Sequence, residues 1–192
     1  MRETQYAAVV IGASAGGTRA LQQIFPCLPA NFPLPIVIVQ HLHPLQDGLA
    51  LIHFKDNIAI KVKDADEKEA LLPGVAYFAP PNYHMLIEAD HTLSLSIDPK
   101  VNYSRPSIDV LFESAANVYG PQLAAILLTG ANNEGAQGLA FIKKKGGLTV
   151  VQDPQSAEFA IMPASALQIA QPDLLLSLDE IGPWLAALGT KE

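Results

Sequence analysis

Three segments of the chain end a run of small or β-branched apolar residues with a side chain capable of nucleophilic or acid–base chemistry. These side chains are the hydroxyl of Ser14, the imidazole of His41 and the carboxylate of Glu134. A serine hydroxyl is a weak nucleophile at neutral pH and needs a base, and histidine, with an ordinary pKa of about 6.5, suits that task. A carboxylate on the second ring nitrogen fixes the tautomer and orientation of the imidazole. We predict an activated serine nucleophile where the three segments converge.

The hydroxyl lies in a glycine-rich turn, Gly12-Ala13-Ser14-Ala15-Gly16-Gly17, between an apolar run and a helical pattern. Gly-x-Ser-x-Gly has the form of a nucleophile elbow, because its glycines remove the steric obstacles to a tight strand-to-helix bend. From the turn alone, two other interpretations stay open. Backbone N–H groups at a helix N-terminus attract a phosphate, and serine is a favoured N-cap. The dinucleotide fingerprint fits poorly, since Ser14 replaces its second glycine.

Strand-like and helix-like patterns alternate along the chain. Strands are predicted at 7–11, 36–39, 58–62, 75–78, 123–128, 148–152 and 174–177, and helices at 18–24, 47–54, 108–119, 136–145, 157–169 and 178–188. Pro163 is expected to interrupt or kink its helix, and 85–97 reads as an exposed hairpin. The predicted fold class is α/β: a doubly wound, mostly parallel sheet with helices on both faces and a small antiparallel hairpin. The carboxyl ends of parallel strands share one edge, so Ser14, His41 and Glu134 are expected to lie at that edge.

The composition restricts the class of protein and its partners. The 192 residues are 49% hydrophobic and 16% charged, as in a single globular domain spanning 1–192. The net charge of −7 argues against nucleic acid and anionic membranes as partners, and no apolar run is long enough for membrane insertion. The single Cys27 cannot form an internal disulfide, which agrees with a cytoplasmic location, and it is expected to pack in the core.

Further groups of residues occur in a fixed order along the chain. They are Ala79-Pro80-Pro81 with His84-Met85, Arg105-Pro106-Ser107-Ile108-Asp109-Val110-Leu111-Phe112, Leu128-Thr129-Gly130 with Glu134-Gly135, and Gln152-Asp153-Pro154 with Phe159 and Met162-Pro163. Together with the glycine turn and Gln40-His41, they resemble the catalytic domain of the CheB-type chemoreceptor glutamate methylesterases. The resemblance runs from about Val9 to Ile181.

This resemblance implies hydrolysis of γ-glutamyl methyl esters on chemoreceptor helices to glutamate and methanol, and deamidation of some glutamines by the same acyl chemistry. Ser14 would be the nucleophile, His41 the general base and then the general acid, and Glu134 the acid of the triad. Backbone N–H groups at Gly130-Ala131 and in the turn after Ser14, at Ala15, are the expected oxyanion donors. No metal and no organic cofactor is implied.

A further set of residues is expected to border the substrate cleft. These are Gln40, Tyr83, His84, Met85 and Arg105. An ordinary strand start explains His84 and Met85 almost as well, and Arg105 either faces an acidic receptor helix or pairs with Asp109 one helical turn on. His43 is expected at the rim, as a rival base only if His41 points away.

Two departures from the family pattern keep a second function open. The family normally has aspartate in a Gly-x-Gly-x-Asp-Gly loop, whereas this chain has Glu134, with Asn132 in place of the second glycine. Glu134 could instead be an acid in a first helical turn, placed there by the helix dipole. Regulated members also carry a receiver domain before the esterase domain, and only 1–6 precede the first predicted strand here. The chain is thus a stand-alone member, a fragment, or akin to domains fused to receptor methyltransferases.

The alternative function is a catalytically weak CheB-like binding module in a signalling complex, with a receiver or methyltransferase domain as its partner. Nucleotide binding at the glycine turn is the third hypothesis. The leading prediction remains a cytoplasmic serine hydrolase that acts on methylated chemoreceptor helices.

Overall fold

The computed structural model describes residues 6–41, 54 and 58–188. The strands are β1 (Ala8–Ala13), β2 (Ile36–Gln40), β3 (Lys61–Asp64), β4 (Val75–Phe78), β5 (His84–Ile87), β6 (Leu93–Ser96), β7 (Leu123–Leu127), β8 (Leu148–Gln152) and β9 (Leu174–Leu176). Seven of them form one sheet in the order β3-β4-β2-β1-β7-β8-β9, with every neighbouring pair parallel. β5 and β6 pair separately as an antiparallel hairpin. The predicted parallel sheet with a small hairpin is confirmed, but the hairpin is not exposed on both sides, because Met85, Ile87 and Leu93 are buried in the core.

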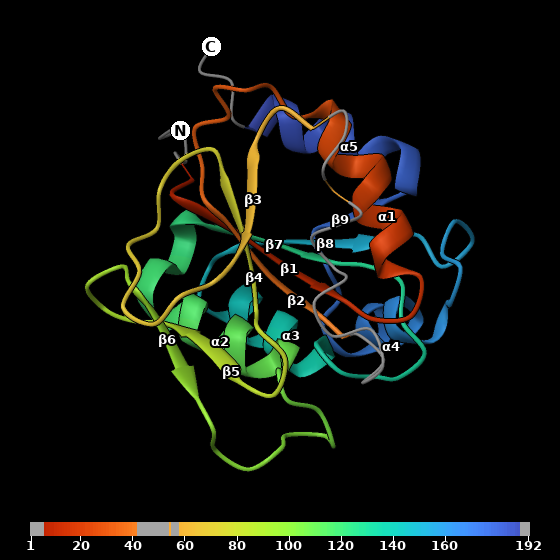
Figure 1. Ribbon diagram of the computed structural model, residues 1–192. Helices are drawn as coiled ribbons and strands as arrows, with labels where there is room; N and C mark the ends of the chain where they lie inside the picture. The colour runs from red at the N-terminus through yellow and green to blue at the C-terminus, as the bar shows by residue number, and fades with distance from the viewer. Residues whose placement is uncertain (1–5, 42–53, 55–57, 189–192) are drawn as a thin grey trace.

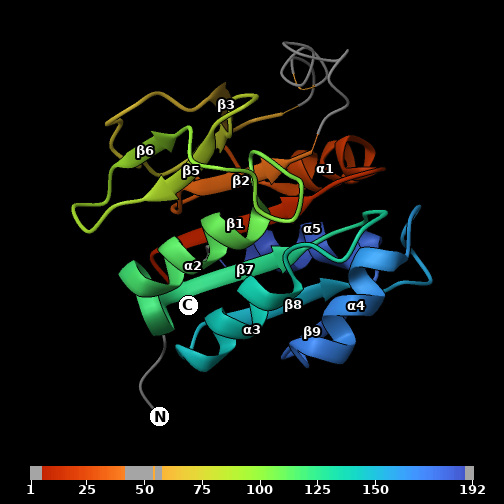
Figure 2. The same ribbon diagram turned by 90° about the horizontal axis from the view of Figure 1, so that it is seen from below.

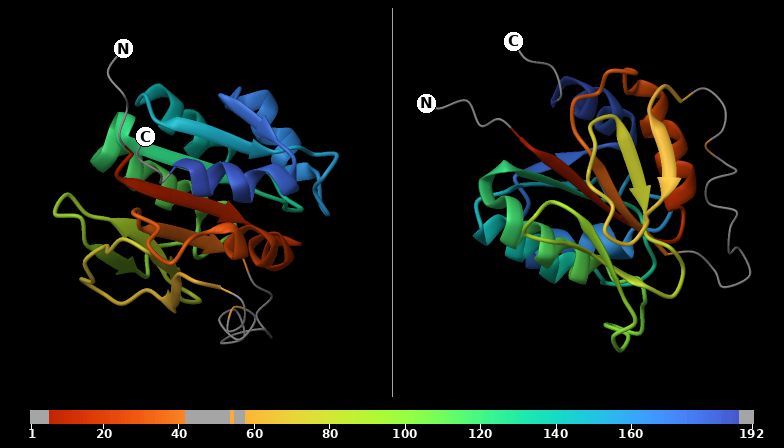
Figure 3. Two further views of the ribbon diagram at one scale, coloured as in Figure 1. Left: turned by 90° about the horizontal axis from the view of Figure 1, so that it is seen from above. Right: turned by 60° about the vertical axis from the view of Figure 1, so that its left-hand side comes forward.

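Helices cover both faces of this sheet, as predicted. They are α1 (Gly17–Ile24), α2 (Ile108–Tyr119), α3 (Ala136–Lys144), α4 (Ile161–Ile169) and α5 (Leu178–Leu188). α1 and α5 lie on one face, while α2, α3 and α4 lie on the other, where α2 also packs against the hairpin (Figures 1, 2 and 3). Alternate residues of a strand point to opposite faces, so Val9 and Ile11 join the core under α1 and α5, and Val10 joins the core under α2. Burial on both faces explains the continuous apolar runs.

Two predicted elements have different limits. The third strand is Lys61–Asp64 rather than 58–62; it lies at the edge of the sheet, where charged side chains are common and no continuous apolar run is required. The helix predicted at 157–169 begins only at Ile161. Pro163 therefore lies in the first turn, where its missing N–H is not needed, and it does not interrupt the helix. The helix predicted at 47–54 lies outside the described residues except for Phe54.

The environment of Cys27 also differs from the prediction. The 3₁₀ turn Phe25–Cys27 buries Phe25 and leaves Cys27 exposed rather than in the core. Within the described ranges, no helix is both long and apolar enough to cross a membrane.

The strand order places a topological switch point at one edge of the sheet. The chain continues from β1 to β2 and the strands on one side, and then returns to place β7, β8 and β9 on the other side of β1. Ligands of open α/β sheets bind outside the carboxyl ends of the strands at such a switch point. The three strands that precede Ser14, His41 and Glu134 are therefore direct neighbours, with β1 in the middle.

Candidate active site

Backbone hydrogen bonds continue the sheet beyond the ends of these strands. The N–H of His41 donates to the carbonyl of Ala13 at 3.0 Å, and the N–H of Ser14 donates to the carbonyl of Thr129 at 3.0 Å. His41, directly after β2, and Thr129, two residues after β7, are thus tied to the glycine turn. The positions of the candidate catalytic side chains follow from the sheet itself, so they sit on a rigid frame.

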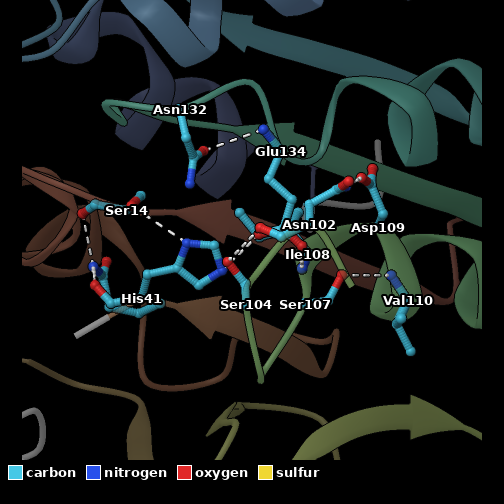
Figure 4. A network of polar contacts seen from close by, with 11 residues as sticks. Ser14, His41, Asn102, Ser104, Ser107, Ile108, Asp109, Val110, Asn132 and Glu134 are labelled. Atoms are coloured by element: carbon cyan, nitrogen blue, oxygen red, sulfur yellow. Dashed lines mark hydrogen bonds and ion pairs between the residues drawn. The ribbon is translucent and has the colours of Figure 1, made fainter. Parts of the chain in front are cut away.

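Ser14, His41 and Glu134 form a continuous line of polar contacts (Figure 4). Nδ1 of His41 lies 3.3 Å from Oγ of Ser14, and Nε2 lies 2.7 Å from Oε2 of Glu134. The His41 side chain is 15% exposed and that of Glu134 is 1% exposed, so water screens the second contact little. The carboxylate oxygen lies off the line of the ring N–H. Catalytic hydrogen bonds in free enzymes are often long or poorly aligned and tighten on substrate binding.

A second helix holds the carboxylate of Glu134. Its Oε1 accepts from the backbone N–H of Ile108 at 2.8 Å, in the first turn of α2, while its Oε2 faces His41. The unpaired N–H groups at a helix N-terminus favour negative charge. The two positions predicted for Glu134, beside His41 and at a helix N-terminus, are therefore both met by one side chain. The helix concerned is α2, brought in from elsewhere in the chain, and not the helix that follows Glu134.

Asp109, the next residue of α2, fixes the place of that helix. Its Oδ1 accepts from the N–H of Gly138 in α3 at 2.7 Å, and its Oδ2 accepts from Nδ2 of Asn102 at 3.1 Å. Burial raises the pKa of Asp109, and the nearby charge of Glu134 raises it further, while the N–H of Gly138 opposes the shift. Asp109 thus fastens α3 and the 97–105 loop to the start of α2, which carries the N–H that Glu134 uses.

Gln40 has a positioning role in place of the predicted place in the cleft. Its side chain is 7% exposed, and its Nε2 donates to the carbonyls of Ser14 at 2.8 Å and His41 at 2.9 Å. A β-carbon at Gly17 would lie 2.1 Å from Oε1 of Gln40, so the start of α1 needs glycine to make room for this amide. One buried amide thereby joins the segments that carry Ser14 and His41.

Gln40→Met, which keeps the volume but removes both hydrogen bonds, is expected to lower the free energy of unfolding by about 1–3 kcal/mol, since the partly buried carbonyl of His41 loses its donor and that of Ser14 keeps only the N–H of Gly17. We also expect kcat for a small activated ester to fall roughly 10- to 100-fold, because the nucleophile and base lose their fixed spacing. Urea unfolding and steady-state kinetics measure the two effects. Gln137→Met, at an exposed position of α3, is the matched control. Equal stability and rate in both variants would contradict the role of Gln40.

Two other predicted cleft residues are corrected by their burial. Met85, in strand β5 of the hairpin, is fully buried in the core, and His84 is 2% exposed with Nε2 3.1 Å from the carbonyl of Pro99. Side chains so enclosed cannot line a substrate cleft. Tyr83 is 41% exposed and remains accessible.

Arg105 does not pair with Asp109 within the described residues, and its predicted contact with a receptor helix stays a prediction. Its guanidinium donates to the carbonyls of Ile97 at 2.8 Å and Asp98 at 3.0 Å, and so closes the base of the loop before α2. Among the described residues, the two carboxylate oxygens of Asp109 accept from Asn102 and Gly138, not from Arg105. His43 lies outside the described residues.

The expected oxyanion donors separate into two groups. The N–H of Gly130 is engaged by the carbonyl of Phe159 at 3.1 Å, and that of Ser14 is engaged by Thr129. Among the described residues, no acceptor contacts the N–H groups of Ala15 and Ala131. Those two remain candidates for stabilising an oxyanion, and Gly130 does not.

A set of hydrogen bonds beside the glycine turn, here called the polar brace, was not predicted from the sequence. Oε1 of the buried Gln152 accepts from the N–H of Thr129 at 2.9 Å, and Oγ1 of Thr129 donates to the carbonyl of Ala15 at 2.9 Å. The brace links β8, β7 and the nucleophile turn. Thr129 and Gln152 each stand at the polar end of an apolar run, and this pattern could have indicated the brace. No group of residues in the described part of the chain is arranged to hold a metal ion.

A parallel α/β sheet with serine, histidine and glutamate in contact at its switch point has the form of a serine hydrolase. A family model described as CheB methylesterase matches residues 9–185, and the chain belongs to this family. It is 54% identical over 176 residues to the Leptospira interrogans "Putative protein-glutamate methylesterase/protein-glutamine glutaminase", covering 92% of this chain and 91% of that relative.

Two further comparisons agree with this membership. The chain is 40% identical over 189 residues to protein-glutamate methylesterase/protein-glutamine glutaminase 1 of Carboxydothermus hydrogenoformans, covering 93% of this chain and 54% of that longer relative. The crystal structure of the Thermotoga maritima CheB methylesterase catalytic domain matches with a TM-score of 0.91 and 33% identity, over 96% of this chain and 99% of that one. The resemblance read from the motifs and the predicted fold are confirmed.

Proposed function

We propose that this chain hydrolyses γ-glutamyl methyl esters of chemoreceptor-like proteins to glutamate and methanol. The observation that carries the proposal is the line of contacts from Ser14 through His41 to Glu134, built on three adjacent strands. The names of the relatives, protein-glutamate methylesterase/protein-glutamine glutaminase, support the choice of substrate.

The geometry supports the following acylation. With the proton of His41 on Nε2, toward Glu134, Nδ1 is free to accept the proton of Ser14 Oγ. The oxygen of Ser14 bonds to the ester carbonyl carbon, and the carbonyl π electrons move to oxygen. When this tetrahedral intermediate collapses, the bond to the methoxy oxygen breaks and methanol leaves with the proton from Nδ1. The ring nitrogens thus exchange the roles they have in chymotrypsin-like sites.

Deacylation repeats these steps with water as the nucleophile. Nδ1 of His41 takes a proton from water, the hydroxide oxygen bonds to the acyl carbon, and Ser14 leaves with that proton while the glutamate side chain is released. A glutamine side chain follows the same course with ammonia as the leaving group, which accounts for a glutaminase activity by one mechanism.

Exposed apolar side chains beside the site support a protein substrate. Asn102 contacts Asp109 next to the helix start that holds Glu134, and the same loop exposes Ile97 by 72% and Tyr103 by 97%. We propose that this loop and Tyr83 meet the apolar side of a methylated receptor helix in the cytoplasm. A receiver or methyltransferase domain is the proposed regulatory partner.

The substrate assignment is tested by incubating the purified chain with a cytoplasmic receptor fragment carrying glutamyl methyl esters. Methanol release and loss of the ester mass from the fragment are expected, at one methanol per ester cleaved. An unmethylated fragment is the control and should release none. Stable binding of the methylated fragment without methanol release would establish the weak binding module instead.

A further inference from the structure

We infer that the side-chain amide of Asn132 donates a hydrogen bond to the oxyanion of the tetrahedral intermediate formed on Ser14. The inference rests on the proposed serine-ester hydrolysis and assigns a residue for which neither the family match nor the named relatives supply a role. Asn132 lies in the loop between β7 and α3, two residues before Glu134.

The orientation of this amide is fixed by its oxygen. Oδ1 of Asn132 accepts from the backbone N–H of Glu134 at 3.1 Å. If the amide were turned over, its NH₂ group would face that N–H donor, so the oxygen must stay where it is. Nδ2 is therefore directed to the opposite side, and the bond that aims it also braces the loop that carries Glu134.

Nδ2 of Asn132 is a donor without an acceptor among the described residues. Figure 4 shows this nitrogen pointing away from Glu134 and toward the side of the site where the Ser14 hydroxyl meets the His41 ring. The side chain is half-buried, so a substrate can reach it while water is partly excluded. A preorganised donor with these properties gains its partner only when charge develops on the substrate oxygen.

Within the part of the chain that the structure describes, few other donors are available at this place. The N–H groups of Ser14, Thr129 and Gly130 are all engaged, by Thr129, Gln152 and Phe159 respectively. The N–H groups of Ala15 and Ala131 remain, and the amide of Asn132 adds a third donor from the loop that carries Ala131.

Asn132→Asp is the decisive variant, because aspartate retains an oxygen for the N–H of Glu134 but cannot donate. We expect kcat for a small activated ester to fall roughly 10²- to 10³-fold with little change in KM. Affinity for an arylboronic acid, which forms a tetrahedral anion on serine, should fall in parallel. Asn133→Asp places the same charge on the exposed neighbouring residue and should stay within about threefold of the native rate.

The outcomes separate the possible roles. An Asn132→Asp rate equal to that of Asn133→Asp overturns the inference. If Asn132→Gly is inactive while Asn132→Asp stays active, the residue acts only by holding Glu134, and the inference is again wrong. A native chain that cleaves the small ester through Ser14 but releases no methanol from the receptor fragment refutes the proposed substrate and leaves this test intact. A chain that cleaves neither refutes both.

Discussion

Replacement of Ser14 by alanine is expected to lower kcat for methyl ester hydrolysis roughly 10⁶-fold, to the level set by binding and oxyanion stabilisation alone. The hydroxyl makes one contact in the described structure, to Nδ1 of His41, whereas the backbone of Ser14 is held by Thr129 and Gln40. Removing the hydroxyl should therefore leave the fold unchanged. Methanol release under saturating substrate measures the effect, and thermal unfolding within about a degree of the native chain verifies the fold.

The matched experiment is the comparison of Ser14→Ala, His41→Ala and the double variant. When two residues act in the same catalytic step, removing the second after the first causes little further loss of kcat. The double variant should therefore be no slower than either single variant. Losses that multiply would show that serine and histidine act independently. Methanol release by Ser14→Ala at more than a tenth of the native rate would contradict the assignment of the nucleophile.

Glu134→Gln is expected to lower kcat roughly 10⁴-fold, since an amide facing Nε2 of His41 no longer holds the ring in the tautomer that leaves Nδ1 free. The change should affect stability little. The amide oxygen can still accept from the N–H of Ile108, and the side-chain volume is unchanged. Kinetics with a small activated ester, together with urea unfolding, separates the catalytic effect from the structural one.

Glu134→Asp tests whether the longer acid suits this site. The shorter side chain cannot reach both the N–H of Ile108 and the ring of His41 from the same loop position. We expect an activity between those of the native chain and Glu134→Gln. A variant at least tenfold faster than the native chain would instead show that Glu134 holds the imidazole badly and that the native chain is the weak binding module.

Glu134, which stands where the family normally has aspartate, is held by a bond to a second residue that differs from the family pattern. The same loop that has glutamate in place of aspartate also has Asn132 in place of glycine, and the side chain of Asn132 accepts from the N–H of Glu134. The two differences act on one loop. The asparagine thus provides a bond that holds the loop at the residue carrying the longer acid.

The order of polar and apolar residues determined the elements of the fold. Strands buried on both faces must be apolar throughout, so the run ending at Gly12 was recognisable without neighbours. The same logic placed Ser14, His41 and Glu134 at strand ends, because a parallel sheet collects those ends at one edge. It misplaced the limits of β3, whose residues Lys61–Asp64 lie at the sheet edge and need no apolar run.

Only the tertiary structure decided which strands are neighbours and where side chains in loops point. Strand order depends on packing between distant segments, which leaves no periodic mark in the chain. For the same reason, the turn of Gln40 into the interior, the burial of His84 and the bond from Ile108 to Glu134 could not be read from local pattern. A polar side chain takes its direction from the donors and acceptors around it, and folding brings these from far along the sequence.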